Sequence, residues 1–477
     1  MTLKALAPSL LFLALAASPA FGQEAEVTDC DRLAAAPLDP GSITVGVPAA
    51  ALDIEAAKSA CLAAIEQAPG NPRLLFQMGR LLDISDADEE AVAYYRRAVG
   101  HAYPAAYTNL AYQYDNGRGV REDVDEAVRL LRLAVERGDP TAHFNLGYLH
   151  KIGRGVARDI DAAARLFEVA AEGGHMPALH DLALIRYEQA QSPEDQAAVL
   201  AMFRRAAEAG VPGAVYMVGY MLAEGEGAGQ DLAGALARYM EAAELGHGRS
   251  AYALGEAYES GVGVSEDATQ ALVWYRKAAD LGHVDAINAV GYAYDHGLGV
   301  ERDLDEAVRW YARAAELGDP WGMSNLGGAY TVGWGETGID YALGRYWLLR
   351  AADAGNAAAN RRLSDIYNKG LGLERNDVTA ASFARAAAEG GDTVGMNNYG
   401  VMLQRGAGVA QDLAEGLRWL EKAAELDEPL AFSNLGYAYR ERLGVEVDMQ
   451  KAREWFQRAA DADIAEAREW LAANPVQ

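Results

Sequence analysis

The sequence predicts an all-α protein, a right-handed α-solenoid of stacked helix–loop–helix repeats. Three recurring features predict this fold: a small residue inside each apolar helix, a loop with two glycines, and an aspartate before an alanine-rich helix. Self-similarity at a fixed interval is the signature of repeat architectures, in which each unit packs mainly on its neighbours. The length of 477 residues is therefore a poor guide to the number of separate domains.

A small residue marks the middle of the first helix in each predicted unit. It recurs at Gly79, Ala111, Gly147, Ala183, Gly219, Gly255, Gly291, Gly327, Ser364, Gly400 and Gly436. From Ala111 onward the step is 36 residues, with one step of 37 between Gly327 and Ser364. A small side chain lets the second helix approach closely, while larger neighbours fill the groove on either side. The period predicts about eleven units within residues 72–463.

A loop with two glycines follows most of the first helices. The stretch 291–303, GYAYDHGLGVERD, shows its form, with Gly297 and Gly299 inside the turn. Glycines at this spacing can also cradle a phosphate, but such a site would not recur in most units at the same point between helices. We therefore expect a hairpin turn, and we do not expect Asp295 to bind calcium.

An aspartate then begins the second helix in most units. Aspartate is a favoured N-cap because its carboxylate accepts hydrogen bonds from the free N–H groups of the first helical turn. In four units a Glu or Gln follows three residues later, a spacing that predicts a reciprocal capping box. These four aspartates are Asp123, Asp267, Asp303 and Asp412.

The second helix is alanine-rich and ends at a glycine in most units, where glycine supplies the left-handed conformation that closes a helix. An aromatic residue occupies the middle of this helix in several units. These residues are Phe167, Phe203, Tyr239, Tyr275, Tyr311 and Phe456. Their recurrence at one position predicts that they pack against the first helix of the same unit.

The units resemble Sel1-like repeats, a tetratricopeptide-related α-solenoid family. Residues 286–318, AINAVGYAYDHGLGVERDLDEAVRWYARAAELG, match nearly every position of the family pattern, and residues 249–283 match almost as well. Three units depart from it. Residues 187–196 lack both loop glycines, residues 442–444 read Arg-Leu-Gly, and the unit at 72–103 resembles a tetratricopeptide unit without the glycine loop. We expect altered local geometry there and an unchanged fold.

The first 22 residues form a separate segment. They contain one positive charge at Lys4, a short apolar run, and small residues near Gly22. This pattern predicts a secretory signal peptide, residues 1–22, that is cleaved near Gly22. No later stretch has 18 consecutive apolar residues, so we expect no membrane insertion and a periplasmic or secreted location.

Two segments flank the repeats. Residues 23–71 are predicted to form an N-terminal capping segment, and they contain Cys30 and Cys61, the only two cysteines. In an oxidising compartment these two residues are expected to form a disulfide. Closing a loop of about 30 residues contributes roughly 3–4 kcal/mol. Residues 464–477 are predicted to form a C-terminal capping helix and tail, because an end repeat must cover an apolar face that has no neighbour.

The chain carries a formal net charge of −27 at pH 7. A strongly acidic surface repels nucleic acids and anionic lipid headgroups, so neither is expected as a partner. The same charge is compatible with basic partners. Acidity by itself keeps an exported protein soluble and does not define a binding site.

No motif in the sequence predicts catalysis, a metal site or a cofactor. His175, His247 and His283 share one turn position at which other units carry Asp or Asn, and the remaining histidines lack ligand spacing such as HExxH. Neither a GxSxG nucleophile motif nor a Ser-x-x-Lys motif is present. We therefore expect a protein that is not an enzyme.

By analogy with tetratricopeptide arrays, the first helices are expected to line a concave groove. The positions three before, one after and four after the central small residue share one helical face. The candidate partner-binding residues on that face are Tyr112, Tyr148, Tyr216, Tyr220, Tyr252, Asn288, Tyr292, Asn397 and Tyr437. Tyrosine combines contact area with a hydrogen bond, which suits recognition of an extended peptide. The alternative is that these tyrosines pack between repeats.

The sequence thus predicts an exported, non-catalytic scaffold or regulator that binds partner proteins or peptides in the groove. The family resemblance implies partners among envelope assembly or signalling components. Two alternatives stay open. One is a glycan-binding scaffold of cell-envelope polysaccharide machinery, whose tyrosines would stack on sugar rings. The other is an enzyme of the β-lactamase or cell-wall hydrolase type.

Overall fold

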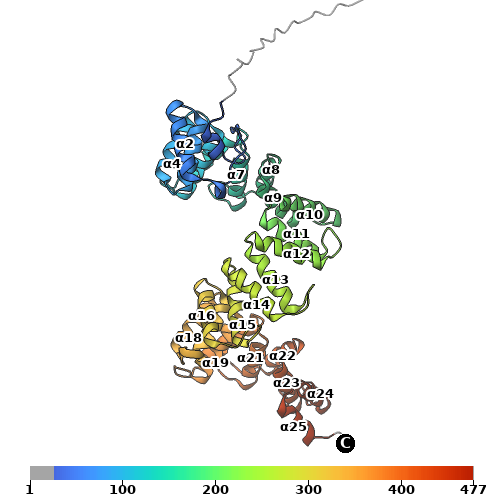
Figure 1. The fold of residues 1–477 in the computed structure, drawn as a ribbon. Helices are drawn as coiled ribbons and strands as arrows, with labels where there is room; N and C mark the ends of the chain where they lie inside the picture. The colour runs from blue at the N-terminus through green and yellow to red at the C-terminus, as the bar shows by residue number, and fades with distance from the viewer. Residues whose placement is uncertain (1–25, 476–477) are drawn as a thin grey trace, which may run out of the picture. The chain divides into compact units, whose positions relative to one another are not determined.

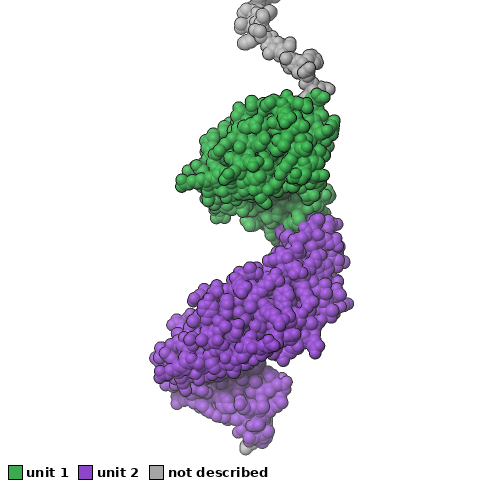
Figure 2. All heavy atoms as spheres, turned by 60° about the vertical axis from the view of Figure 1, so that its left-hand side comes forward, with its two compact units in different colours: residues 1–214 green, residues 215–477 purple. Residues whose placement is uncertain are grey.

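The computed structural model describes residues 26–475, which form α-helices and two short 3-10 helices without any β-strand (Figure 1). The chain divides into two compact units, residues 1–214 and 215–477, coloured separately in Figure 2. The division falls within helix α11 (Pro212–Glu224). Each unit consists of stacked helix pairs, so the predicted all-α solenoid class is confirmed. The predicted signal peptide, residues 1–22, lies outside the described residues.

The first unit contains a leading segment and four helix pairs. The leading segment holds α1 (Asp29–Ala34), η1 (Ala49–Ala51) and α2 (Ile54–Gln67). The pairs are α3 (Pro72–Ile84) with α4 (Asp88–Gly100), α5 (Pro104–Asn116) with α6 (Val124–Val135), α7 (Pro140–Ile152) with α8 (Ile160–Glu172), and α9 (Met176–Gln189) with α10 (Pro193–Glu208). The pairs α3/α4 and α9/α10 form although their loops lack the paired glycines.

The second unit contains seven helix pairs and a last helix. The pairs are α11 with α12 (Leu232–Glu244), α13 (Gly248–Ser260) with α14 (Ala268–Asp280), α15 (Val284–His296) with α16 (Leu304–Glu316), α17 (Pro320–Val332) with α18 (Tyr341–Asp353), α19 (Ala357–Lys369) with α20 (Asp377–Glu389), α21 (Thr393–Arg405) with α22 (Leu413–Glu425), and α23 (Pro429–Glu441) with α24 (Met449–Asp461). The last helix is α25 (Ala465–Ala473). A 3-10 turn, η2 (Gly335–Thr337), lies in the one loop that carries an extra residue.

The central small residue of the first helix packs against the middle of the second helix. A methyl group added at Gly291 would come within 2.8 Å of the Tyr311 ring, and one at Gly147 within 2.8 Å of the Phe167 ring. Both rings are almost completely buried. Because packed carbon atoms do not approach this closely, these helices can meet only where the side chain is absent. The predicted role of the small residue is confirmed in these pairs.

The paired loop glycines adopt left-handed backbone conformations, with φ of 71° at Gly297 and 68° at Gly299. A methyl group at Gly299 would also clash with the carbonyl oxygen of Ala268, at the start of the second helix in the preceding pair. The second glycine therefore permits contact between repeats as well as the turn. Arg442 takes the same left-handed conformation, with φ of 62°, where other units have glycine. The change of geometry expected at this turn is not seen in its backbone.

The aspartates before the second helices are N-caps, but the predicted capping boxes are wrong. The carboxylate of Asp303 accepts hydrogen bonds from the N–H groups of Asp305 and Glu306, both at 3.0 Å. The reciprocal bond to the backbone of Asp303 is not made by Glu306, because that N–H already donates to the carbonyl of Tyr294 at 3.0 Å. The side chain of Glu306 pairs with Arg309 instead.

The backbone N–H groups of the other three predicted aspartates donate in the same way to carbonyls near the end of the first helix. The partners are Tyr114 for Asp123, Tyr258 for Asp267, and Leu403 for Asp412. Complete capping boxes occur at Thr28 with Asp31 and at Ser192 with Asp195, before α1 and α10. The glycine-loop turn thus supplies the bond that a capping box would otherwise make.

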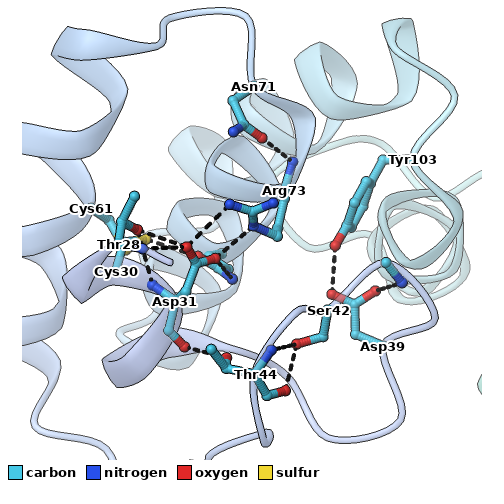
Figure 3. Close-up of polar contacts among 12 residues, drawn as sticks. Thr28, Cys30, Asp31, Asp39, Ser42, Thr44, Cys61, Asn71, Arg73 and Tyr103 are labelled. Carbon is cyan, nitrogen blue, oxygen red and sulfur yellow. Dashed lines mark hydrogen bonds and ion pairs between the residues drawn. A yellow bond between two sulfur atoms is a disulfide. The ribbon is translucent and has the colours of Figure 1, made fainter. Parts of the chain in front are cut away.

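The leading segment packs onto α3 through a buried ion pair beside the disulfide (Figure 3). Cys30 of α1 and Cys61 of α2 form the predicted disulfide, with Cα atoms 4.5 Å apart. The fully buried Asp31 accepts hydrogen bonds from Arg73 Nε at 2.6 Å and Nη2 at 3.1 Å. Burial alone would raise the pKa of Asp31, but hydrogen bonds from Arg73 and Thr28 outweigh it, so this pKa is lowered.

Two further contacts hold the leading segment in place. Arg80 donates to the backbone carbonyls of Ala34 and Ala35 at 3.1 and 3.2 Å, and to that of Val47 at 2.7 Å. The hydroxyl of Tyr103 donates to Asp39 at 2.7 Å, as Figure 3 shows. These bonds satisfy buried polar groups and attach an irregular chain to regular helices.

The last helix packs on the last pair of the second unit. The Trp470 ring of α25 lies 4.3 Å from the Phe456 ring of α24, measured between centroids. Phe456 is fully buried, and the neighbouring Ala467 of α25 is also buried. Helix α25 therefore covers apolar surface that a further repeat would otherwise bury.

Candidate partner-binding site

The predicted partner-binding residues all lie on first helices. Tyr112 lies on α5, Tyr148 on α7, Tyr216 and Tyr220 on α11, Tyr252 on α13, Asn288 and Tyr292 on α15, Asn397 on α21, and Tyr437 on α23. We call the surface at positions three before, one after and four after the central small residue the first-helix face. Its residues differ widely in exposure, and exposure separates those available to a partner from those that pack between repeats.

Three of the five candidate tyrosines directly after the small residue are exposed, whereas Tyr220 is half-buried. Tyr112 is 48% exposed, Tyr148 46% and Tyr292 43%. The Tyr292 ring stacks on that of His296, one helical turn later, with centroids 3.9 Å apart. Tyr437 is half-buried beneath the guanidinium of Arg440, which lies 4.7 Å from the ring centroid. This position presents aromatic surface in both units.

The two candidate tyrosines three before the small residue instead pack against the N-cap of the next first helix. Tyr216 lies against His247 with ring centroids 5.0 Å apart, and Tyr252 stacks on His283 at 4.6 Å. Burial lowers the pKa of His283, which keeps its stacked ring neutral at pH 7. The half-buried Tyr216 and Tyr252 are thus junction residues between repeats, in line with the packing alternative.

The same junction has different chemistry in other repeats. Phe144 stacks on His175 at 4.4 Å, the Thr108 hydroxyl donates to Asp139 at 2.5 Å, and Arg361 Nε donates to Asp392 at 3.2 Å. Aromatic residues meet histidine here, whereas Thr and Arg meet aspartate. Sequence reasoning placed these histidines correctly in turns but missed their partners. The constant separation of 31 residues was the signal that would have revealed them.

The two asparagines of the predicted set also join repeats. Asn325 Nδ2 donates to Asn288 Oδ1 at 3.1 Å, and Asn434 Nδ2 donates to Asn397 Oδ1 at 2.7 Å. Asn397 is only 3% exposed. Its inclusion among groove residues is corrected, because its side chain is enclosed by the packing of α21 against the next repeat. Asn288 is half-buried and stays at the edge of the face.

A pocket opens on the first-helix face between α11, α12 and α13, with a volume of about 310 Å³. Tyr216 and Tyr220 line it, together with Glu256 of α13. Burial raises the pKa of Glu256 above its usual range. The pKa of the adjacent Tyr252 rises to about 12, chiefly through burial and then through the charge of Glu256. The pocket thus joins aromatic rings to a carboxylate at its exposed edge.

Several other features of residues 26–475 bear on function. No group of three or more His, Cys, Asp or Glu side chains within this range is placed to hold a metal ion. None of the helices within it combines the length and the apolar character needed to cross a membrane. His175 Nδ1 accepts a hydrogen bond from the N–H of Ala178 at 3.1 Å, so the turn role predicted for this histidine is confirmed.

The repeat pattern matches a known family along most of the chain. The sequence profile of the Sel1 repeat matches residues 104–139, 140–175, 212–247, 248–283, 284–319, 322–356, 357–392, 393–428 and 431–464. The protein belongs to the Sel1 repeat family. The helix pairs that this profile does not match, α3/α4 and α9/α10, are the two whose loops lack glycine. Sel1 repeat arrays serve in general as scaffolds for protein interaction.

Solved Sel1 repeat structures resemble this chain. One is a protective antigen present in uropathogenic Escherichia coli strains that displays an SLR fold, with a TM-score of 0.65 and 28% identity over 88% of this chain and 91% of that one. Another is a Sel1 repeat protein from Oxalobacter formigenes, with a TM-score of 0.48 and 31% identity over 51% of this chain and 99% of that one. No curated protein sequence matches this chain.

Proposed function

We propose that this Sel1 repeat protein is an exported, non-catalytic scaffold or regulator that binds partner proteins or peptides along its first-helix face. The observation that carries the proposal is the exposure of Tyr112, Tyr148 and Tyr292, each between 43% and 48% exposed at the same repeat position. Isolated exposed aromatic residues are common on protein surfaces. Recurrence at the same position of three first helices, α5, α7 and α15, is what favours a binding role.

The physical properties of this surface suit an extended partner. Tyrosine supplies a large contact area and a hydroxyl while losing little side-chain entropy, because few torsions must be fixed. The helices beneath are already packed, so binding costs little ordering of the scaffold. We propose that the partner is an extended protein segment lying across several first helices, in the concave groove expected of such arrays.

Export is part of the proposal and has three supports. Residues 1–22 have the composition of a secretory signal peptide. The disulfide between Cys30 and Cys61 suits an oxidising compartment. The relative from uropathogenic E. coli is described as a protective antigen. A periplasmic or secreted location accounts for all three.

Site-specific crosslinking tests the proposed face. A photo-crosslinking amino acid would replace Tyr148 or Tyr292 in the full chain expressed in its host. The matched control positions are Arg129 and Arg309, which are exposed on the second helices α6 and α16. We expect the same partner to be captured from both tyrosine positions and from neither arginine position. Capture confined to the arginine positions would refute binding along the first-helix face.

A glycan scaffold is the second candidate, because the same exposed rings of Tyr112, Tyr148 and Tyr292 could stack on sugars. A glycan array probed with the purified chain separates the two candidates. Specific glycan binding that is lost in a Tyr148→Ala/Tyr292→Ala variant would favour sugars over protein segments. Binding that persists in this variant would place any glycan site elsewhere.

A further inference from the structure

The pocket between α11, α12 and α13 has an apolar floor, an aromatic wall and a charged edge. Leu232 and Leu236 of α12 form part of the floor, and the wall contains Tyr216, Tyr220 and Tyr239. The Tyr216 ring lies 5.5 Å from that of Tyr239 and 6.4 Å from that of Tyr220, measured between centroids. Aromatic rings from two helices thus line one small hollow.

The pocket is open because two alanines stand where other repeats carry larger residues. Ala253 lies two residues before the small residue Gly255 of α13. In α17 and α23 the same position carries Asn325 and Asn434, whose side chains reach back to bond the preceding first helix at 3.1 and 2.7 Å. At Ala253 no such side chain fills the space between the repeats.

The second alanine is Ala223, four residues after the small residue of α11. The equivalent residue of α13 is Glu259, whose carboxylate accepts a hydrogen bond from Tyr275 at 2.6 Å. Helix α15 also carries an alanine, Ala289, at the position of Ala253, but there the facing residue is this larger Glu259. Among the described junctions between first helices, only α11/α13 carries alanine at both positions, and it also has an aromatic wall.

The polar groups of the pocket leave it with an excess of negative charge. Arg249 Nε donates to the Tyr216 hydroxyl at 2.8 Å, and its guanidinium lies 5.7 Å from that ring, so Arg249 forms part of the wall. Glu224 and Glu256 also line the pocket. Glu259 and Asp285 lie near enough to raise the pKa of Glu256 further, after the larger effect of burial. One arginine thus faces several carboxylates.

We propose that this pocket receives the side chain of an arginine from a partner protein. The aliphatic stem would lie on Leu232 and Leu236, and the guanidinium would stack on the tyrosine wall while pairing with Glu224 and Glu256. Arginine suits the site better than lysine, because a planar guanidinium stacks on rings and can bind carboxylates through two donors. The net charge of −27 favours such a basic segment. The inference rests on the proposed function and names the chemistry that one part of the face recognises.

Matched small-molecule probes test the pocket in the full chain. N-acetyl-arginine amide and N-acetyl-citrulline amide have nearly the same shape, and only the first carries a charge. Each would be titrated into methyl-labelled protein while the NMR signals of Leu232, Leu236 and Val262 are followed. We expect saturable shifts with the arginine probe and at least tenfold weaker binding of the citrulline probe. N-acetyl-norleucine amide serves as the apolar probe.

Variants identify which groups supply the preference. Glu224→Gln/Glu256→Gln is expected to reduce binding of the arginine probe to the citrulline level. The control Glu316→Gln/Glu425→Gln removes the same charge from exposed helix ends in other repeats and should leave binding unchanged. Ala253→Asn introduces the residue found at this position in α17 and α23, and should abolish binding while the fold is kept.

The outcomes separate this inference from the broader proposal. Equal binding of the arginine and citrulline probes, or tighter binding of the norleucine probe, would overturn the arginine pocket. Loss of the preference for the arginine probe over the citrulline probe in the control variant Glu316→Gln/Glu425→Gln would also overturn it. Capture of a partner from Tyr292 in those circumstances would leave the scaffold proposal standing. Arginine binding at the pocket without any capture from the tyrosine positions would support the pocket and refute the extended face.

Discussion

Replacing Arg73 with methionine tests whether the buried ion pair holds the leading segment on the repeats. Methionine keeps the aliphatic bulk but removes the guanidinium that donates to Asp31 at 2.6 and 3.1 Å. The fully buried carboxylate would then lack its cation, and breaking a buried pair in this way costs about 3–5 kcal/mol. The hydrogen bonds from Thr28 and Gln77 to Asp31 persist, so we expect a loss of stability of about 3 kcal/mol, at the lower end of this range.

The pH dependence gives this prediction a second signature. The pKa of Asp31 is lowered in the folded protein, so its stabilising contribution is present above the ordinary value of 3.8 and is lost as pH falls through the lowered pKa. In Arg73→Met, the hydrogen bonds from Arg73 no longer offset the effect of burial on the carboxylate, so we expect the pKa of Asp31 to rise. The difference in stability between the two proteins should therefore be largest near neutral pH, and it should shrink as pH falls from the raised pKa of the variant to the lowered pKa of the unmodified protein.

Hydrogen exchange of the full chain measures the effect locally. A loss of about 3 kcal/mol corresponds to roughly a hundredfold faster exchange through opening of α1, α2 and α3. Helices α23 and α24 serve as the internal control, because they belong to the other unit. The double variant Asp31→Asn/Arg73→Met should recover part of the protection by removing the buried charge. Unchanged protection in α1–α3, or an equal loss in α23 and α24, would refute this account of the ion pair.

Three further perturbations have defined outcomes. Reducing the Cys30–Cys61 disulfide, which spans 31 residues, should destabilise α1 and α2 by about 3–4 kcal/mol. Hydrogen exchange with and without reductant measures this loss, and equal exchange rates in the two conditions would contradict it. Gly291→Ala should lower the free energy of unfolding by about 1–3 kcal/mol, because the new methyl group overlaps the Tyr311 ring. An unchanged midpoint of urea unfolding would argue against close packing at this position. Arg442→Gly should stabilise the last repeat by about 1 kcal/mol, since glycine adopts the left-handed conformation without strain, and a lower midpoint would count against that reasoning.

Features repeated in most units could be predicted from the sequence. The close approach at Gly291 and Tyr311 follows from one alignment of small and aromatic residues, because both recur at fixed positions. The aspartate caps were also predictable, since each acts within its own helix. The capping boxes were not, because the turn brings the carbonyl of Tyr294 to the N–H of Asp303. That competing bond belongs to the three-dimensional hairpin and not to the local spacing.

The partner-binding face was predicted less well, because exposure depends on pairs of residues in different repeats. Tyr112 and Asn397 lie on the same predicted face, yet one is half-exposed and the other is enclosed by Asn434. The pocket depends on Ala223 and Ala253 together, and the effect of each alanine depends on the residue that faces it across the junction. Sequence periodicity aligns equivalent positions, but it does not show which unlike residues meet across a junction.

The side-chain pairs between neighbouring repeats, such as Tyr252 with His283 and Phe144 with His175, constrain how such an array grows by gene duplication. Each pair spans two repeats, so a tandem copy of one helix pair creates a junction between residues that belonged to the same copy. Duplicating α13/α14 with its N-cap would set a new His247 against Tyr252, the aromatic pairing already present between Tyr252 and His283. Duplicating α7/α8 would set Asp139 against Phe144 and leave a carboxylate facing an apolar ring. Some repeats can therefore be copied in place, whereas others must be inherited together with their neighbours.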